Sequence, residues 1–365
     1  MMNNPKAITS GRIMKVLTSM ALLCLVFGYC APYFHPDTVP FLPFFGLSYP
    51  IWVLIVILIT LFWFIKKSNW KYICLILLVI GIKFHLRIVG FSFFQGSPAK
   101  NSIYIMSYNV RLFGLYDAST TASRDRIFQF LRAEQPDVAC FQEYYRQDKP
   151  TEFETFDSIK TILKSVDYHE RSAHNENGRR NFGIAIFSKY PMIARGDVIF
   201  ESQSMMDFNY CIFADIVAHS DTFRIYNVHL QSIRLSETGE KTDLGRIEKL
   251  RIGFRKMQTA SSKRADQARK VIEHMESSPY PVLVCGDFND TPMSYTYNQF
   301  QNKLTDGFRE ASWGLGSTYN GRIPAGRIDY IFRSEGIECS DFKIFQNNFS
   351  DHKPIRCRIV ITSNQ

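Results

Sequence analysis

Apolar residues are distributed in two different ways along this 365-residue chain. Before residue 100 they form three nearly continuous stretches, at about 14–33, 44–65 and 72–94. From residue 101 onward they form short runs rich in β-branched and aromatic residues, which are typical of strands. Two longer segments, 123–135 and 259–277, repeat apolar residues at helical spacing and predict amphipathic helices. The pattern therefore predicts a membrane anchor over 1–99 and a strand-rich domain over 100–365.

Each N-terminal stretch approaches the roughly 20 residues that a helix needs to cross a bilayer. The stretch 44–65 is the clearest, because it carries no charge and is followed by Lys66 and Lys67. The stretch 72–94 is the weakest, because Lys83 and Arg87 fall near its middle, where a charge costs a few kcal/mol. We therefore expect two or three transmembrane helices.

The basic residues around these stretches predict an orientation. Lys and Arg precede the first stretch and follow the second, whereas the loop 34–43 contains neither. The positive-inside rule then places the N-terminus and the loop 66–71 in the cytoplasm. The domain is extracytoplasmic if the third stretch crosses, and cytoplasmic if that stretch only lies in the interface. Its length favours crossing, so we expect a multi-pass protein of the cell (inner) membrane with an extracytoplasmic domain.

The net charge and the cysteine content of the chain say little about the function of the domain. Residues 1–99 hold 8 of the 43 basic and 1 of the 34 acidic residues, which leaves the domain 35 basic and 33 acidic side chains, a net charge of +2. The basic character of the chain is therefore mainly a property of the membrane flanks and is not evidence for a nucleic-acid surface. The five cysteines of the domain lack CxxC spacing, and we expect them to be reduced and mostly buried.

Polar clusters that follow strand-like apolar runs carry most of the information about chemistry. These clusters contain Asn109, Glu143, His229, Asp287 with Asn289, and Asp351 with His352, and Asp329 lies inside the further run GRIDYIF. Carboxylates, amides and imidazoles gathered at strand ends are what a divalent-metal phosphoester hydrolase needs. Taken singly, each cluster is weak evidence, because Asp and Asn at a strand end usually form a turn.

The order of the motifs is more specific than any one of them. NVRLF, QE, NVHLQ, GDFND, RIDYIF and SDHKPI, in this order, resemble the endonuclease/exonuclease/phosphatase superfamily, in particular its deoxyribonuclease I-like and sphingomyelinase-like branches. The resemblance covers about 100–362. It implies an α/β fold, a four-layer sandwich of two mixed β-sheets flanked by helices, and Mg²⁺ (or Mn²⁺) as the cofactor.

The resemblance also implies roles for the metal ligands and for the attacking water. Glu143 would bind the metal, Asn109 would be a ligand or hold a bound water, and Asp351 would complete the metal shell. Asp287 would orient or deprotonate the attacking water, and Asn289 would contact the scissile phosphate.

A second group of residues would bind the phosphate. The resemblance implies that His352 contacts a phosphate oxygen and is held by Asp329, and that His229 contacts phosphate or serves the leaving group. An aspartate beside His352 would favour the protonated imidazole. Arg179 and Arg180 in the sequence GRRNFG are further candidates for substrate contacts, or they belong to a polar loop.

The sequence leaves three functions open. The first is a membrane-anchored phosphodiesterase or phosphatase for a lipid headgroup or another small phosphoester, the second is a membrane-anchored nuclease for DNA or RNA, and the third is a catalytically silent scaffold. The basic segment 246–270 fits a solvated helix face, a surface for anionic lipids or a nucleic-acid contact. Its few aromatic residues give little support for base stacking. No protein partner can be inferred.

Overall fold

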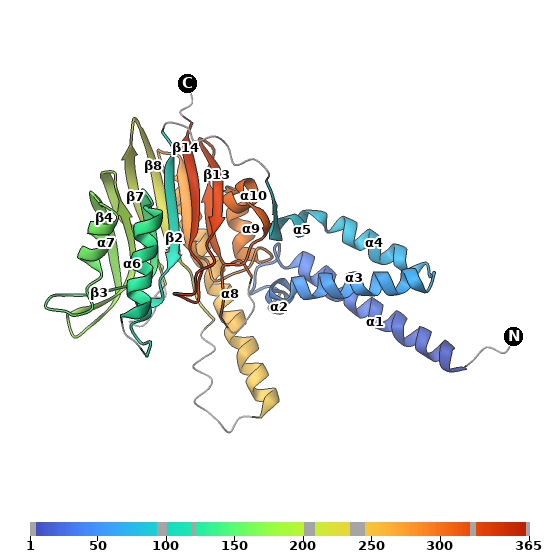
Figure 1. Cartoon of the computed structure of the whole chain (residues 1–365). Coiled ribbons are helices and arrows are strands. Elements are labelled where there is room, and N and C mark those ends of the chain that lie inside the picture. The colour runs from blue at the N-terminus through green and yellow to red at the C-terminus, as the bar shows by residue number, and fades with distance from the viewer. Residues whose placement is uncertain are drawn as a thin grey trace. The chain divides into compact units, whose positions relative to one another are not determined.

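The computed structural model describes residues 5–92, 101–118, 121–200, 209–233, 245–321 and 326–362. The chain divides into two compact units (Figure 1). One contains the residues before 89 together with parts of 234–262 and 291–298, and the other contains the rest. All the residues that the motifs single out belong to the second, strand-rich unit.

Two six-stranded sheets form the centre of the strand-rich unit within the described residues. In the first, of order β13-β14-β2-β3-β5-β4, the strands are β2 (Ile103–Asn109), β3 (Val138–Gln147), β4 (Asp167–Glu176), β5 (Arg180–Ser188), β13 (Ile337–Ile344) and β14 (Ile355–Ile361). In the second, of order β10-β12-β9-β8-β7-β6, they are β6 (Met192–Val198), β7 (Tyr210–Ala218), β8 (Asp221–His229), β9 (Val282–Asp287), β10 (Thr305–Asp306) and β12 (Asp329–Arg333). The pairs β2–β3 and β8–β9 are parallel and the others antiparallel, so both sheets are mixed, as predicted.

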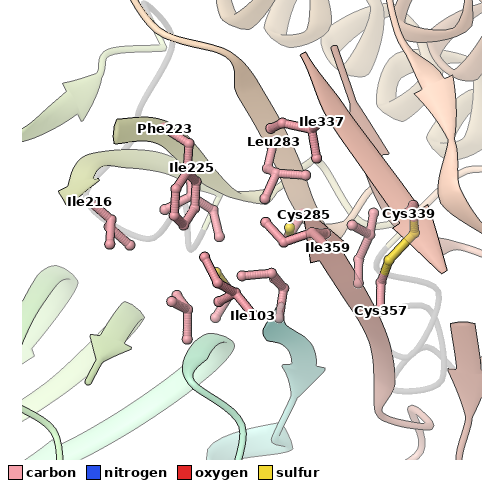
Figure 2. Close-up of a cluster of buried hydrophobic side chains, with 14 of the residues drawn as sticks. Ile103, Ile216, Phe223, Ile225, Leu283, Cys285, Ile337, Cys339, Cys357 and Ile359 are labelled. Atoms are coloured by element: carbon pink, nitrogen blue, oxygen red, sulfur yellow. A yellow bond between two sulfur atoms is a disulfide. The ribbon is translucent and has the colours of Figure 1, made fainter. Parts of the chain in front are cut away.

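The facing sides of the two sheets form one hydrophobic core. Ile103 and Ile359 from the first sheet lie opposite Ile225 and Cys285 from the second (Figure 2), and all four are essentially inaccessible to solvent. Strand side chains alternate between faces, so the apolar residues of each run divide between this core and an outer face. Such apolar burial is the main favourable term in folding.

Helices cover the outer faces, as the predicted sandwich requires. Helices α6 (Ala122–Glu134) and α7 (Phe156–Ile162) pack on the first sheet through buried side chains such as Leu131 and Ile159. On the second sheet, His274 of α8 (Arg246–Glu276) is bonded to Tyr226 of β8, with 2.8 Å between its Nδ1 and the Tyr226 hydroxyl. Short elements complete the unit: a 3₁₀ turn (Arg111–Gly114), α10 (Gly307–Ala311) and the antiparallel pair β1 (Val89–Phe91) with β11 (Trp313–Leu315). Helix α9 (Tyr295–Gln301) begins within 291–298, which belongs to the other unit.

A buried polar network crosses the core between the two sheets. Gln142 of β3 donates to the side-chain oxygen of Asn227 of β8 at 2.6 Å. Asn227 in turn donates to the carbonyls of Phe141 at 3.0 Å and Ala185 at 2.9 Å in the first sheet. Buried amides are costly unless they are hydrogen-bonded. The network therefore favours one relative placement of β3 and β8, the strands that carry Glu143 and His229.

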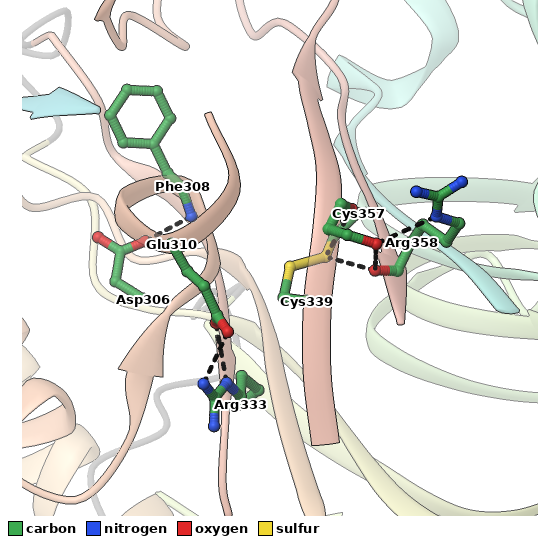
Figure 3. The surroundings of a disulfide bond; sticks show 8 residues. Asp306, Phe308, Glu310, Arg333, Cys339, Cys357 and Arg358 are labelled. Atoms are coloured by element: carbon green, nitrogen blue, oxygen red, sulfur yellow. Dashed lines mark hydrogen bonds and ion pairs between the residues drawn. A yellow bond between two sulfur atoms is a disulfide. The ribbon is translucent and has the colours of Figure 1, made fainter. Parts of the chain in front are cut away.

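The cysteines differ in part from the prediction. Cys140, Cys211 and Cys285 are buried and free, as expected. Cys339 and Cys357, in contrast, form a disulfide between the adjacent strands β13 and β14, so the prediction that all five are reduced is wrong. The bond lies beside α10 (Figure 3), where a side chain in place of the hydrogen of Gly307 would come within 2.9 Å of Cys339 Sγ.

The N-terminal unit contains five helices among its described residues before 89. They are α1 (Pro5–Cys30), α2 (Leu42–Leu47), α3 (Tyr49–Ile65), α4 (Trp70–Ile80) and α5 (Ile82–Ile88). Within the described residues, one helical segment, Gly11–Cys30, is long and apolar enough to cross a membrane. The expectation of two or three transmembrane helices is therefore not met.

The physical reason is that the second and third apolar stretches are interrupted. The stretch 44–65 is divided at Ser48, and α3 that follows is shorter than 18 residues. The stretch 72–94 breaks at Gly81 and leaves the helical conformation at β1, while residues 93–94 lie outside the described part. Arg87, expected in the bilayer or at its surface, is buried and donates to Asn298 Oδ1 at 2.7 Å within the same unit.

Candidate active site

Most of the predicted site residues meet at one end of the two sheets. Asn109 is the last residue of β2, while His229 and Asp287 are the last residues of the parallel strands β8 and β9 and are partners in register. Asp329 begins the antiparallel strand β12 opposite Asp287. Parallel strands place their carboxyl ends at the same edge, which accounts for the approach of His229 to Asp287. Asn109 reaches them from the other sheet.

Three residues of the site depart from ordinary strand geometry. Glu143 has a φ of 46° and lies where the pairing of β3 with β5 shifts in register, so a bulge redirects its side chain. Asn289 also has a positive φ, 53°. Gly286 has a φ of 146°, and a Cβ there would lie 2.0 Å from the carbonyl oxygen of Val228. This close approach of β8 and β9 requires glycine.

Asp287 is at the centre of the cluster and is 1% exposed. Its Oδ1 accepts the backbone N–H of Asn289 at 2.8 Å, and its Oδ2 accepts the side-chain amide of Asn109 at 3.0 Å. The Nε2 atoms of His229 and His352 each lie 3.6 Å from the same Oδ2. Asp287 therefore contacts residues from the ends of β2 and β8, from the segment after β9 and from the segment before β14.

Asp329 and His352 form a buried ion pair. Both carboxylate oxygens of Asp329 lie 3.1 Å from Nδ1 of His352. Burial disfavours the imidazolium, but the charges of Asp329 and Asp287 outweigh it and raise the pKa of His352 to about 10. Burial raises the pKa of Asp329 to about 6, which is still well below that of its partner. At neutral pH the imidazole is therefore protonated, and it presents Nε2 toward Asp287.

The donor set fits a divalent cation that prefers oxygen ligands. Glu143 keeps 34% of its side chain exposed, and its Oε1 lies 3.3 Å from the Asn109 amide nitrogen, which also binds Asp287. The carboxylates of Glu143 and Asp287 thus both approach the Asn109 amide, and one or two carboxylates are the usual protein ligands of Mg²⁺. In the orientation observed, Asn109 turns its nitrogen toward them, while its oxygen accepts the backbone N–H of Arg111 at 3.1 Å.

Two further groups of donors bear on metal binding. Single ligand atoms of Asp287, Asp329 and His352 lie within 4.8 Å of one another, which is close enough to share an ion. The ion pair already engages two of these residues, so they are better accounted for by proton and phosphate chemistry. Asp351 is half-buried and borders a cavity of about 400 Å³ with Arg111 and Asn348, among other residues.

Comparison with known proteins identifies the family. A model described as the endonuclease/exonuclease/phosphatase family matches residues 106–352, more than half of the chain. The chain belongs to this family. Family members are typically hydrolases of phosphoesters and generally use divalent metals. A second model, described as a domain of unknown function, matches residues 11–88, and no curated protein matches the chain significantly.

Solved structures of endonuclease/exonuclease/phosphatase proteins share the fold. A family protein from Bacteroides thetaiotaomicron is 19% identical, covering 73% of this chain and 99% of that one, with a TM-score of 0.54. A mannosyl-6-phosphatase from the same species is 18% identical over 71% of this chain and 100% of its own, with a TM-score of 0.52. The catalytic domain of human Nocturnin, with bound sulfate, is 18% identical over 72% and 94%, with a TM-score of 0.52.

Within the described residues, the two arginines singled out in GRRNFG bond to groups outside this cluster. Arg179 donates to the carbonyls of Asp148 at 3.2 Å and Pro150 at 2.6 Å. Arg180 pairs with Glu176 at 3.2 Å across the turn between β4 and β5. These contacts stabilise the β4–β5 hairpin and its neighbouring loop. A contact of either arginine with substrate stays a prediction.

Other residues that contact this cluster were not singled out from the sequence. The ring of Tyr319 packs edge-on against His352, with ring centres 5.0 Å apart. Burial raises the pKa of Tyr319, and Asp351 and other site carboxylates raise it further, so its hydroxyl stays protonated. Ser350 donates to the carbonyl of Asn109 at 2.8 Å and thereby ties the loop before β14 to the end of β2. The motif SDH could have indicated Ser350, but no sequence signal indicates Tyr319.

Proposed function

We propose that this chain is a membrane-anchored, divalent-metal-dependent phosphoester hydrolase. The observation that carries the proposal is the convergence on Asp287 of Asn109, Asn289 and two imidazoles. A buried carboxylate, an imidazolium and an adjacent half-exposed Glu143 supply a proton acceptor, a phosphate ligand and a metal ligand. We also propose that residues 1–99 form the anchor and 100–365 the catalytic domain.

In this proposal the attacking water is bound by Asp287. The carboxylate accepts a proton from the water. The N–H groups of Asn289 and Asn109 fix the orientation of the carboxylate. A positioned base of this kind typically contributes 10²–10⁴-fold to the rate. The attack needs no covalent nucleophile, so no Ser or Cys takes part.

In this proposal His352 stabilises the charge that develops on the phosphate. His352 is held by Asp329, so it presents a cationic N–H without reorientation during the reaction. We propose that His229, which is 4% exposed, contacts another phosphate oxygen or serves the leaving group. Glu143 and Asp351 would hold Mg²⁺ or Mn²⁺, which polarises the phosphoryl oxygen and lowers the pKa of water. Asn109 would join them if its amide turned its oxygen inward.

We propose a lipid headgroup or a small phosphoester as the substrate. Two observations support this proposal: the segment Gly11–Cys30 is long and apolar enough to cross a membrane, and residues 100–365 carry a net charge of only +2. An extracytoplasmic domain remains part of this proposal, with the single segment Gly11–Cys30 as the membrane-crossing helix. The disulfide between Cys339 and Cys357 favours an oxidising compartment and is consistent with that side.

Hydrolysis by the purified full-length chain with Mg²⁺ tests the proposal. The substrates are a sphingomyelin-type lipid, a phosphoinositide, a generic phosphodiester, plasmid DNA and RNA. We expect lipid or small-ester turnover, lowered by about 10²–10⁴-fold in Asp287→Asn, because that change removes the proton acceptor. Asp266→Asn, on an exposed part of α8, is the matched control and should retain activity.

Each substrate class gives a distinct result. Turnover of DNA or RNA alone, abolished by Asp287→Asn, would replace the proposal with a nuclease. Metal binding with no turnover of any substrate would leave the catalytically silent scaffold. Equal activity of Asp287→Asn and the parent chain would show that the chemistry lies elsewhere.

A further inference from the structure

The first turns of α8 expose an apolar stripe that the proposed chemistry does not use. Ile247, Leu250 and Phe254 are 83%, 74% and 38% exposed. Their spacing of three and four residues places them on one side of the helix. Large apolar side chains gathered in this way on a surface mark an interaction site.

Positive charge borders this stripe. At 3.6 residues per turn, Arg246 and Arg251 lie about 40° to either side of it, and Lys249, Arg255 and Lys256 lie further round the helix. Arg246, Lys249, Arg251 and Arg255 are exposed and form no ion pair with any described residue. Glu248 is the one acidic residue within 246–256. The stripe therefore faces outward within a strongly basic surface.

We infer that residues 246–256 of α8 form an interfacial helix that binds an anionic membrane surface. The inference rests on the membrane attachment in the proposed function. Ile247, Leu250 and Phe254 would enter the boundary between headgroups and acyl chains, and the flanking arginines would contact lipid phosphates. This part of α8 belongs to the same compact unit as the apolar helix α1.

The charge pattern favours lipid over other occupants. A second copy of the same helix would bring five cations against five, which is repulsive. A nucleic acid would leave the aliphatic side chains of Ile247 and Leu250 facing phosphates, and Phe254 is the only aromatic residue within 246–256 that could stack on a base. An anionic bilayer satisfies both the apolar stripe and its basic borders.

Hydrogen–deuterium exchange on the full-length chain in lipid nanodiscs tests this inference without a substrate. The discs contain phosphatidylcholine alone or phosphatidylcholine mixed with phosphatidylglycerol. We expect the amides of 246–256 to exchange several-fold more slowly in the anionic discs. Leu250→Glu should abolish this protection, because it places an anion within the stripe. Thr259→Glu adds the same charge on another side of α8 and should preserve the protection.

The outcomes separate this inference from the proposed function. A chain that does not incorporate into either disc refutes attachment and this inference together. A chain that incorporates but exchanges equally over 246–256 in both discs refutes only the interfacial helix. Protection that rises with protein concentration in neutral discs identifies a second copy of the chain as the partner. Protection by an oligonucleotide but not by anionic lipid identifies a nucleic-acid contact. Either result overturns the inference. Hydrolysis is measured independently in every case.

Discussion

Replacing Asp329 with Asn tests how the proposed site keeps His352 positively charged. The amide preserves the shape of the carboxylate but removes its charge from a side chain that is 2% exposed. His352 titrates at about 10 instead of its usual 6.5. At about 1.4 kcal/mol per pH unit, this difference corresponds to roughly 5 kcal/mol of stabilisation of the imidazolium. Asp329 supplies the first of the charges responsible, ahead of Asp287 and Asp351.

The expected result is a change in the shape of the pH–rate profile. Because the pKa of His352 is raised, the imidazolium is present below about pH 10 and is lost as the pH rises through that value. If Asp329 supplies even a third of the stabilisation, the alkaline limb of Asp329→Asn moves down by at least about one pH unit. On that limb the variant then loses about tenfold in rate beyond any loss at neutral pH.

The assay is kcat/KM from pH 5 to about pH 10.5 with a hydrolysed small phosphoester. Asp197→Asn is the matched control, because Asp197 of β6 and His169 of β4 form a second Asp–His pair. Oδ1 of Asp197 lies 3.5 Å from Nε2 of His169. The control should leave the profile unchanged, and circular dichroism should show both variants folded. An alkaline limb at the same pH in Asp329→Asn and the parent would refute the electrostatic role, even if the rate fell uniformly.

Two further predictions concern the metal and the disulfide. Glu143→Gln removes an anionic oxygen from the proposed metal site and should weaken Mn²⁺ binding by at least about tenfold, measured by electron paramagnetic resonance titration; unchanged affinity would remove Glu143 from the ligand set. Replacing both Cys339 and Cys357 with Ser should lower the free energy of unfolding by about 3 kcal/mol, because the bond closes a loop with a sequence separation of 18. Denaturant unfolding measures this loss, and an unchanged midpoint and slope would mean that the bond does not form.

The positions of the site residues along the strands were predictable because they depend on local rules. Asn109, His229 and Asp287 each end an apolar run. The carboxyl ends of the parallel strands β8 and β9 meet at one edge of their sheet, whereas the approach of Asn109 depends on how the two sheets pack together. The orientation of Glu143 was not predictable, because it depends on a bulge that forms only when β3 pairs with β5. Tyr319 likewise reaches His352 only through the fold.

The N-terminal helices and the cysteines show the other limits of sequence. Gly81 interrupts the third apolar stretch, a signal that hydropathy averaged over the stretch conceals. Pairing of Cys339 with Cys357 depends on β13 lying beside β14, which spacing alone does not specify. The local environment of Arg179 depends in the same way on where the loop at 148–150 lies.

The division of the site between the two sheets has a consequence for how the enzyme matures. Asn109 and Glu143 come from one sheet, and His229, Asp287 and Asp329 come from the other. A chain with only one sheet formed would therefore have only part of the proposed site. By linkage, any ion or substrate that touches both halves must also strengthen the adhesion between the sheets. The two sheets therefore pack together and complete the proposed site in the same step of folding.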